Sequence, residues 1–121
     1  MSFDEALARH LAAIENRDLA EYEKTVHSDA VVVLGNGTII QGLTAILELH
    51  IGWFADTDWS LKTEVLHRTE LHGLASVVLK VDYHDVDQNG APTQHSYLLG
   101  LVFTKSEDDD WLLIHDQNTF F

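Results

Sequence analysis

The chemistry open to this sequence depends mainly on histidine, because 8 of its 121 residues are histidines and none is cysteine. An unperturbed imidazole titrates at about pH 6.5, so histidine can serve as a general acid, a general base or a ligand. The lack of cysteine excludes a thiol nucleophile, a disulfide framework and a thiolate metal site. Acid–base chemistry is therefore the first class of function to consider.

Three histidines are the strongest candidates for this chemistry. His10 and His50 fall on the apolar faces of predicted helices, and His115 falls on the predicted inward face of the last strand. We expect His10, Tyr97 and His115 to line one shared cavity, with His115 pointing at a ligand and Asp116 as a reserve base. Each histidine could instead be a structural residue whose partner is a backbone carbonyl.

Further ligand-binding residues are predicted beside these. Tyr83 and Gln117 share the inward face with Tyr97, and Trp53 lies one turn beyond His50 on the same predicted helix. The aromatic side chain of Trp53 is more typical of a core or a pocket wall than of a stacking platform.

Other kinds of site lack their motifs. The sequence has no His-Glu-x-x-His, no His-x-His and no Gly-x-Ser-x-Gly, so a metal site would have to be assembled from distant strands. Gly35-Asn36-Gly37 follows a predicted strand but does not open a phosphate-binding helix. We therefore expect no metal and no cofactor.

The charge of the chain limits its partners. A formal net charge of −13 makes nucleic acid and anionic membranes poor partners and favours a neutral or cationic small-molecule ligand. The first ten residues lack the basic and apolar regions of a secretion signal, and the apolar runs are too short to span a bilayer. A cytoplasmic location is the resulting expectation.

Helical signals dominate the first half of the chain. Ser2 with Glu5 forms a capping box that opens a predicted helix over 3–16, and Asp18 with Glu21 opens a second, shorter helix. Leucine and isoleucine at helical spacing predict a third helix over 43–56.

Extended segments fill most of the rest. Short strands are predicted at 31–34 and 38–40, and long ones at 59–71, 74–86, 92–105 and 111–120. Asn89-Gly90 is the strongest hairpin signal. Helices followed by strands favour a single α+β domain over 1–121, with helices on one face of an antiparallel sheet.

The alternation of side chains predicts a register for this sheet. With Val81 opposite Leu99 and Phe103 opposite Trp111, one face runs from apolar at one end to polar and aromatic at the other. The last strand is apolar on both faces at its start. If its parity is shifted by one residue, Asp116 and Asn118 take the inward places of His115 and Gln117.

The order of these segments, including VHSDAVVVLGNG, QGLTAI and the closing WLLIHDQNT, resembles the nuclear transport factor 2-like superfamily. The likeness is to its SnoaL-like and ketosteroid isomerase-like branch, and the last segment also resembles the association domain of calcium/calmodulin-dependent kinase. The resemblance implies a cone-shaped, strongly curved sheet wrapped around three helices, one deep pocket and dimers formed through the sheet. Members include isomerases, dehydratases, cyclases and non-enzymatic modules, so the fold does not name a function.

The resemblance does not carry over residue by residue. The general-base aspartate of the isomerases falls at Leu34 and their second oxyanion acid near Leu99, while their oxyanion tyrosine falls at His10. The basic residues of the kinase domain's pocket fall near Val81 and Leu101. Neither activity is implied by its usual residues.

Two hypotheses therefore stand. The first is a small-molecule pocket protein with cofactor-independent lyase or isomerase chemistry, and the second is a non-catalytic ligand-binding or assembly module. An open cavity with several polar groups favours the first, and a cavity plugged by Trp53 or Phe54 favours the second. In either case the outer face of the sheet, with Leu98, Gly100 and Val102, is expected to form a homodimer.

Overall fold

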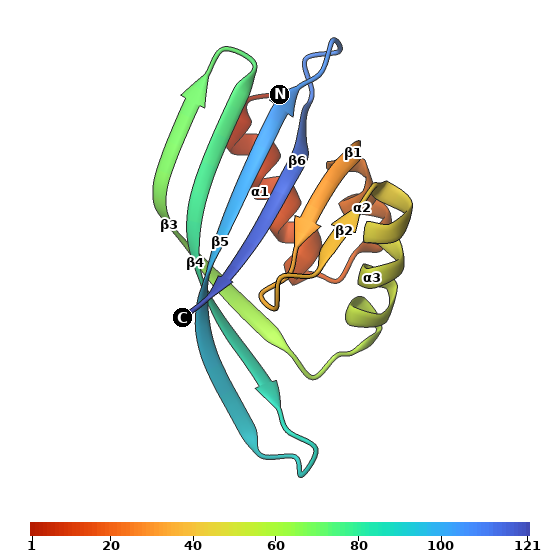
Figure 1. Ribbon diagram of the computed structural model, residues 1–121, viewed down its shortest axis with the longest axis vertical. Helices are drawn as coiled ribbons and strands as arrows, with labels where there is room; N and C mark the ends of the chain where they lie inside the picture. The colour runs from red at the N-terminus through yellow and green to blue at the C-terminus, as the bar shows by residue number, and fades with distance from the viewer.

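The computed structural model describes all 121 residues, as three helices packed against one strongly curved sheet (Figure 1). This architecture confirms the expected α+β class. None of the helices combines the length and the apolar character needed to cross a bilayer. In chain order the elements are α1 (Phe3–Glu15), α2 (Leu19–Lys24), β1 (Val26–Val33), β2 (Ile39–Gln41), α3 (Leu43–Ala55), β3 (Ser60–Leu71), β4 (Leu74–Val86), β5 (Pro92–Lys105) and β6 (Trp111–Phe120).

The predicted caps set the starts of the first two helices. The Ser2 hydroxyl accepts from the backbone N–H of Glu5 at 3.1 Å, and the Asp18 carboxylate accepts from the backbone N–H of Glu21 at 3.1 Å. Each bond satisfies a backbone donor that has no partner inside the helix. One apolar side of α1 packs toward the sheet. Its buried residues are Phe3, Ala6, Leu7, His10, Ala13 and Ile14.

The sheet has six strands in the order β2-β1-β6-β5-β4-β3. Strands β3 to β6 pair antiparallel as expected, but β1 runs parallel to β6, so the sheet is mixed rather than wholly antiparallel. Parallel neighbours need a long crossover. Here that crossover is the whole chain between the two strands, which the sequence pattern could not reveal.

The register of the long hairpin differs by two residues from the prediction. Val81 faces Tyr97 rather than Leu99. The loop decides this, because the backbone N–H of Ala91 and that of Asn89 both donate to the Asp87 carboxylate and Gly90 adopts a positive φ of 78°. A shift by two keeps every side chain on its predicted face.

A β-bulge in β6 changes its parity. Phe103 pairs with Leu113 while Val102 pairs with His115, so Ile114 is the extra residue. Leu113 and Asp116 are both buried, whereas Gln117 is exposed. The bulge thus places Asp116 and Asn118 on the concave face, as the shifted alternative had it.

An aromatic cluster closes one end of the concave face. The Phe3 ring meets Phe103 at 5.4 Å and Trp111 at 5.5 Å between centroids, both edge-to-face. Trp111 is only 5 % exposed. These contacts join the first turn of α1 to β5 and β6, so this end of the cone is filled by a packed aromatic core.

Trp111→Ala is expected to lower the free energy of unfolding by about 3–5 kcal/mol, because it leaves a cavity between helix and sheet. Urea denaturation measures the loss. Phe121→Ala is the control, since Phe121 is 84 % exposed and its removal should change stability by under about 0.5 kcal/mol. A loss below about 1 kcal/mol for Trp111→Ala would contradict the packing described here.

Candidate functional site

The other end of the concave face holds a cavity of about 490 Å³. Its wall comes from α1, β1 and the turn after it, α3, and the four long strands β3 to β6. Of 19 lining residues 12 are hydrophobic, and none is lysine or arginine. The volume lies within the range of small-molecule sites, which are mostly apolar with a few placed polar groups.

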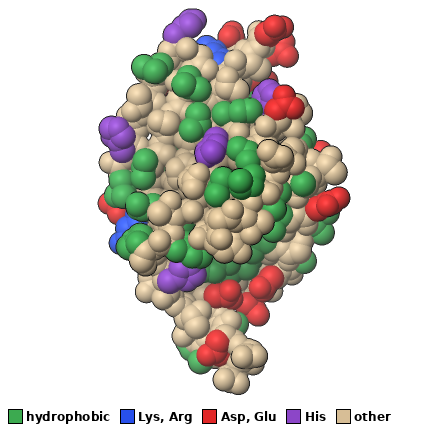
Figure 2. Space-filling model, viewed as in Figure 1, with side chains coloured by type: hydrophobic (Ala, Val, Ile, Leu, Met, Phe, Trp, Pro, Cys, Tyr) green, Lys and Arg blue, Asp and Glu red, His purple; other side chains and the backbone are tan.

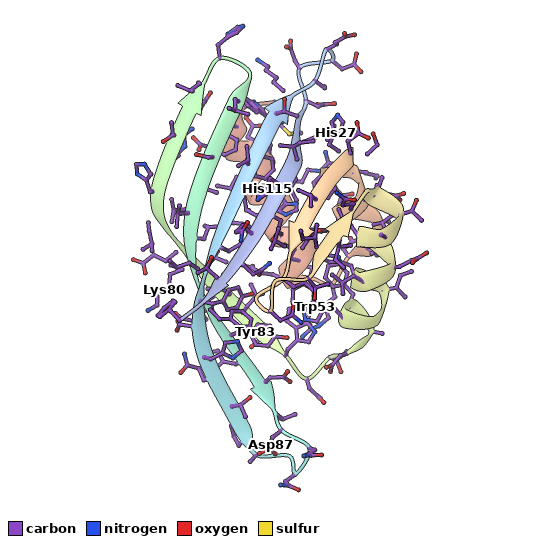
Figure 3. The ribbon with its side chains drawn as sticks, viewed as in Figure 1. His27, Trp53, Lys80, Tyr83, Asp87 and His115 are labelled. Atoms are coloured by element: carbon purple, nitrogen blue, oxygen red, sulfur yellow. The ribbon has the colours of Figure 1, made fainter.

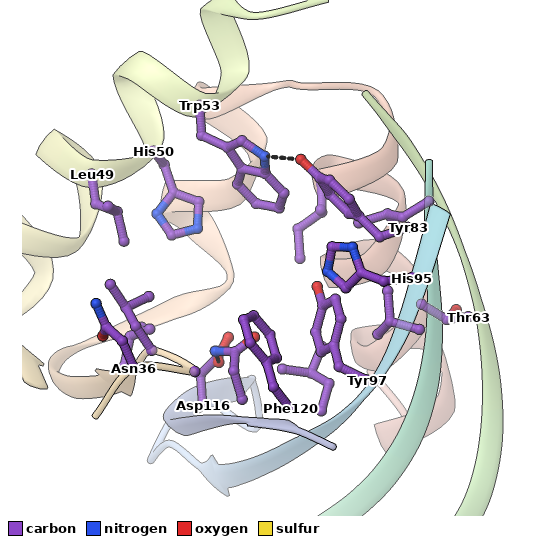
Figure 4. Close-up of a pocket in the computed structure, with 18 of the residues that line it drawn as sticks. Asn36, Leu49, His50, Trp53, Thr63, Tyr83, His95, Tyr97, Asp116 and Phe120 are labelled. Carbon is purple, nitrogen blue, oxygen red and sulfur yellow. Dashed lines mark hydrogen bonds between the residues drawn. The ribbon is translucent and has the colours of Figure 1, made fainter. Parts of the chain in front are cut away.

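Asp116 is the one carboxyl group in this wall (Figure 4). It is 7 % exposed, and its Oδ1 accepts one hydrogen bond, from Asn118 Nδ2 at 3.0 Å. The same Nδ2 donates to the Val33 carbonyl at 2.9 Å, which fixes the amide. Burial raises the pKa of Asp116 to about 7, against the smaller opposing effect of the Asn118 bond. Near neutral pH this carboxyl can therefore either give up or take a proton.

His50 faces Asp116 from the opposite wall, on α3 (Figure 4). Its Nδ1 lies 2.7 Å from the carbonyl oxygen of Ile46, which can only accept, so Nδ1 carries the proton and Nε2 is an acceptor. The ring stacks on Tyr22 at 4.2 Å between centroids. Burial lowers the pKa of His50, which keeps the ring neutral and leaves Nε2 as a hydrogen-bond acceptor.

Trp53 and Tyr83 join the helix layer to the sheet at the cavity wall. Trp53 Nε1 donates to the Tyr83 hydroxyl at 3.0 Å, as the dashed line in Figure 4 marks. Trp59 stacks on Trp53 at 4.3 Å and donates from Nε1 to its carbonyl oxygen at 2.8 Å. Trp53 is thus held as a wall residue, and the cavity is not plugged by it.

Tyr97 and His95 complete the sheet side of the wall. The pKa of Tyr97 is raised first by burial and then by the nearby charge of Asp116. His95 contacts Tyr83, Tyr97 and Phe120, with ring centroids 5.4 to 5.8 Å apart. His95 was not among the predicted site residues, although its spacing of two residues from Tyr97 puts it on the same strand face.

His10 does not line the cavity, so its predicted place there is wrong. The residue is fully buried, with Nδ1 2.7 Å from Thr25 Oγ1 and its ring packed on Tyr22 and Phe103. Because the Thr25 hydroxyl donates to the Tyr22 carbonyl oxygen at 2.7 Å, it must accept from His10 Nδ1–H. Burial first, and His50 second, lower the pKa of His10 to about 3, so it is a neutral core residue.

His115 and Gln117 are likewise not part of the cavity wall. The bulge at Ile114 turns both away, and they contact each other instead, with His115 Nε2 3.2 Å from Gln117 Oε1. Figure 3 shows His115 along β6, apart from Trp53 and Tyr83. A strand apolar on both faces gave no sign of the bulge.

The predicted residues therefore divide into two groups. The structure brings together Asp116, Tyr97, Tyr83, His50 and Trp53, and it leaves out the three corrected above. The positions that correspond to the isomerase acids are apolar wall residues, namely Leu34 and Leu99. No group of three or more histidine and carboxylate side chains is arranged to hold a metal ion.

Comparison with known proteins gives a family match and several structural likenesses. A family model described as a SnoaL-like domain matches residues 4–120. No curated protein sequence matches the chain significantly. Among solved structures, a ketosteroid isomerase-like protein from Erwinia carotovora atroseptica superposes with a TM-score of 0.84 at 16% identity, covering 98% of this chain and 92% of that one.

Two further structures show the breadth of the fold. The CaMKII association domain of C. elegans has a TM-score of 0.71 at 19% identity, covering 96% of this chain and 91% of that chain. A nuclear transport factor 2 (NTF2-like) superfamily protein from Salmonella enterica has a TM-score of 0.77 at 15% identity, covering 96% of this chain and 86% of that chain. At these identities the likeness concerns the fold alone.

Asp116→Asn is expected to stabilise the protein, and more at pH 8 than at pH 4. The neutral carboxyl favours the folded state, and this contribution is full below the ordinary pKa of 3.8 and is lost as pH rises to about 7. The difference between the ordinary and the raised pKa of Asp116 corresponds to a gain of up to about 4 kcal/mol in the free energy of unfolding of Asp116→Asn at high pH. Urea denaturation at the two pH values measures it.

Asp108→Asn, in the exposed turn between β5 and β6, is the matched control and should have the same small effect at both pH values. An Asp116→Asn effect that does not change with pH would show that the carboxyl is not buried as described.

Proposed function

This chain belongs to the SnoaL-like domain family, and we propose that its cavity binds a small molecule and moves a proton on it, with Asp116 as the acid–base group. The reaction class is that of a cofactor-independent isomerase or lyase. The observation that carries this proposal is one carboxyl in a mostly apolar wall, with its pKa raised by burial to about 7. A base with a pKa close to the operating pH is ionised in a large fraction of the molecules and still has a strong tendency to take up a proton.

The proton would move between the ligand and one carboxylate oxygen. Ionised Asp116 takes a proton from a C–H bond next to an electron-withdrawing group, and the electron pair moves into that group. The Tyr97 hydroxyl could donate to the oxygen on which charge develops. Nε2 of His50, on the opposite wall, could accept a hydrogen bond from a ligand hydroxyl and so orient the ligand. Isomerisation returns the proton at another atom, and elimination loses a leaving group.

A generic base substrate can test this without knowledge of the natural ligand. Nitrobenzisoxazole loses one ring proton to a base, its N–O bond breaks, and a coloured cyanophenolate forms. The wild-type protein should accelerate this reaction, with a rate that rises with pH through about 7 as Asp116 ionises. Asp116→Asn should lower the rate about 100-fold or more.

Asp82→Asn is the matched control, because Asp82 pairs with Ser96 on the opposite, convex face and is half exposed. His115→Gln tests the corrected prediction. Both variants should keep the wild-type rate. If Asp116→Asn keeps it as well, the carboxyl is not the base.

Assembly is the second function with support, and it does not compete with the first. The convex face of β5 presents Leu98, Gly100 and Val102, which stay partly exposed in one chain. One similar structure is an association domain. We propose that this face forms a homodimer.

A dimer of this kind should bury roughly 1,200–2,000 Å² in total. Analytical ultracentrifugation at tens of micromolar should show dimers for the wild type and monomers for Val102→Asp, which places a charge on the face. The control Asp108→Lys changes charge in an exposed loop and should remain dimeric. A monomeric wild type would refute the interface.

A further inference from the structure

The cavity wall contains an acidic side chain but no lysine or arginine to pair with it. Its 19 residues include one carboxyl group and no lysine or arginine. Oδ1 of that carboxyl, on Asp116, accepts from Asn118, and the structure gives Oδ2 no protein partner. A buried carboxyl in this state needs either a proton or a positive charge nearby.

Aromatic rings make up much of the remaining wall. Trp53 and Tyr83 are nearly parallel, with centroids 6.5 Å apart, and Tyr97 meets Phe120 edge-to-face at 5.2 Å. The electron-rich faces of such rings attract organic cations, and the attraction is stronger where water is excluded. These rings line the same cavity as Oδ2 of Asp116, which has no hydrogen-bond partner in the protein.

The surroundings of the cavity are also negative. Asp56 and Asp85 both raise the pKa of Tyr83 by their charge, after the larger effect of its burial. The guanidinium of Arg17 has a smaller, opposite effect on the pKa of Tyr83, and it is already engaged, because it lies 4.3 Å over the Trp59 ring and donates to the carbonyls of Asp56 and Trp59. On the side of the molecule that Figure 2 shows, acidic side chains predominate over lysine and arginine, and the formal net charge of the chain is −13. A field of this sign draws cations toward the cavity.

We propose that the cavity selects an organic cation, a protonated or quaternary amine, whose positive charge lies against the Asp116 carboxylate and the aromatic faces of Trp53 and Tyr97. This inference rests on the proposed small-molecule function of the cavity and names the ligand class within it. The cation takes the place of the proton that the buried carboxyl otherwise holds.

Binding of the cation should therefore be linked to the ionisation of Asp116. The other titratable groups around it are Tyr22 on α2, Tyr97 and His95 on β5, Tyr83 on β4 and His50 on α3. On its other side, β1 presents Val32. The phenols and His50 stay neutral near pH 7, because burial moves their pKa values away from it. His95 needs its own control variant.

Calorimetric titration with a shape-matched pair of probes can test this. Choline phenyl ether and its tert-butyl analogue differ only in whether nitrogen or carbon carries the three methyl groups, so apolar burial is the same. At pH 8 the cation should bind at least about tenfold more tightly than the analogue. At pH 5.5 the preference should shrink, and near pH 6 binding should release a proton, seen as a dependence of the heat on the buffer.

Asp116→Asn should abolish most of the preference at pH 8, whereas Asp82→Asn, which removes the same charge from the convex face, should retain it. His95→Gln should leave the pH dependence of the preference in place. Equal binding of the two probes, binding of neither, or a preference that survives Asp116→Asn would each overturn the proposal. Base catalysis on nitrobenzisoxazole without a cation preference would leave the proposed function standing and remove only this ligand class. A cation preference without base catalysis would do the reverse.

Discussion

The concave face of the sheet must be covered, and the helices cover it unevenly. At one end Phe3 fills the space against Phe103 and Trp111, and this end is a packed core. At the other end α3 packs against β1 and β2, and the hydrogen bond from Trp53 to Tyr83 joins it to β4 across the cavity wall. The curvature that closes one end therefore leaves about 490 Å³ open at the other. Core and cavity are two consequences of the same geometry.

The bulge at Ile114 decides the chemical character of that open end. Without it, the inward positions of β6 would carry an imidazole and an amide, and with it they carry a carboxyl and the amide that supports it. Burying a carboxyl in an apolar wall opposes folding unless the group is protonated or paired. Asp116 has one hydrogen bond from the protein to offset this, which is why it is the group in the cavity most open to a ligand.

Buried histidines in this protein serve two different purposes, and their surroundings explain which. His10 and His50 both have a fixed tautomer, the first through Thr25 and the second through the Ile46 carbonyl. The Nε2 of His10 faces only the core and has no partner, whereas His50 borders the cavity. Both residues lie on apolar helix faces, so the sequence pattern does not distinguish them. The difference is their position in the fold, because His50 lies beside the cavity and His10 lies in the core.

Local patterns in the sequence predicted most of the helices and strands of this protein, although β1 begins at Val26 rather than at Val31. The signals involved act between near neighbours in the chain, so they can be recognised without the structure. They are the caps at Ser2 and Asp18, the Asn89-Gly90 turn and the alternation of side chains in the long strands. The sequence also identified Asp116, Tyr97 and His50 as candidates. Which candidates meet could not be predicted, because the parallel pairing of β1 with β6 and the bulge at Ile114 depend on packing between distant segments. A bulge reverses the faces of all residues beyond it, and a strand that is apolar on both faces carries no local signal of where that reversal occurs.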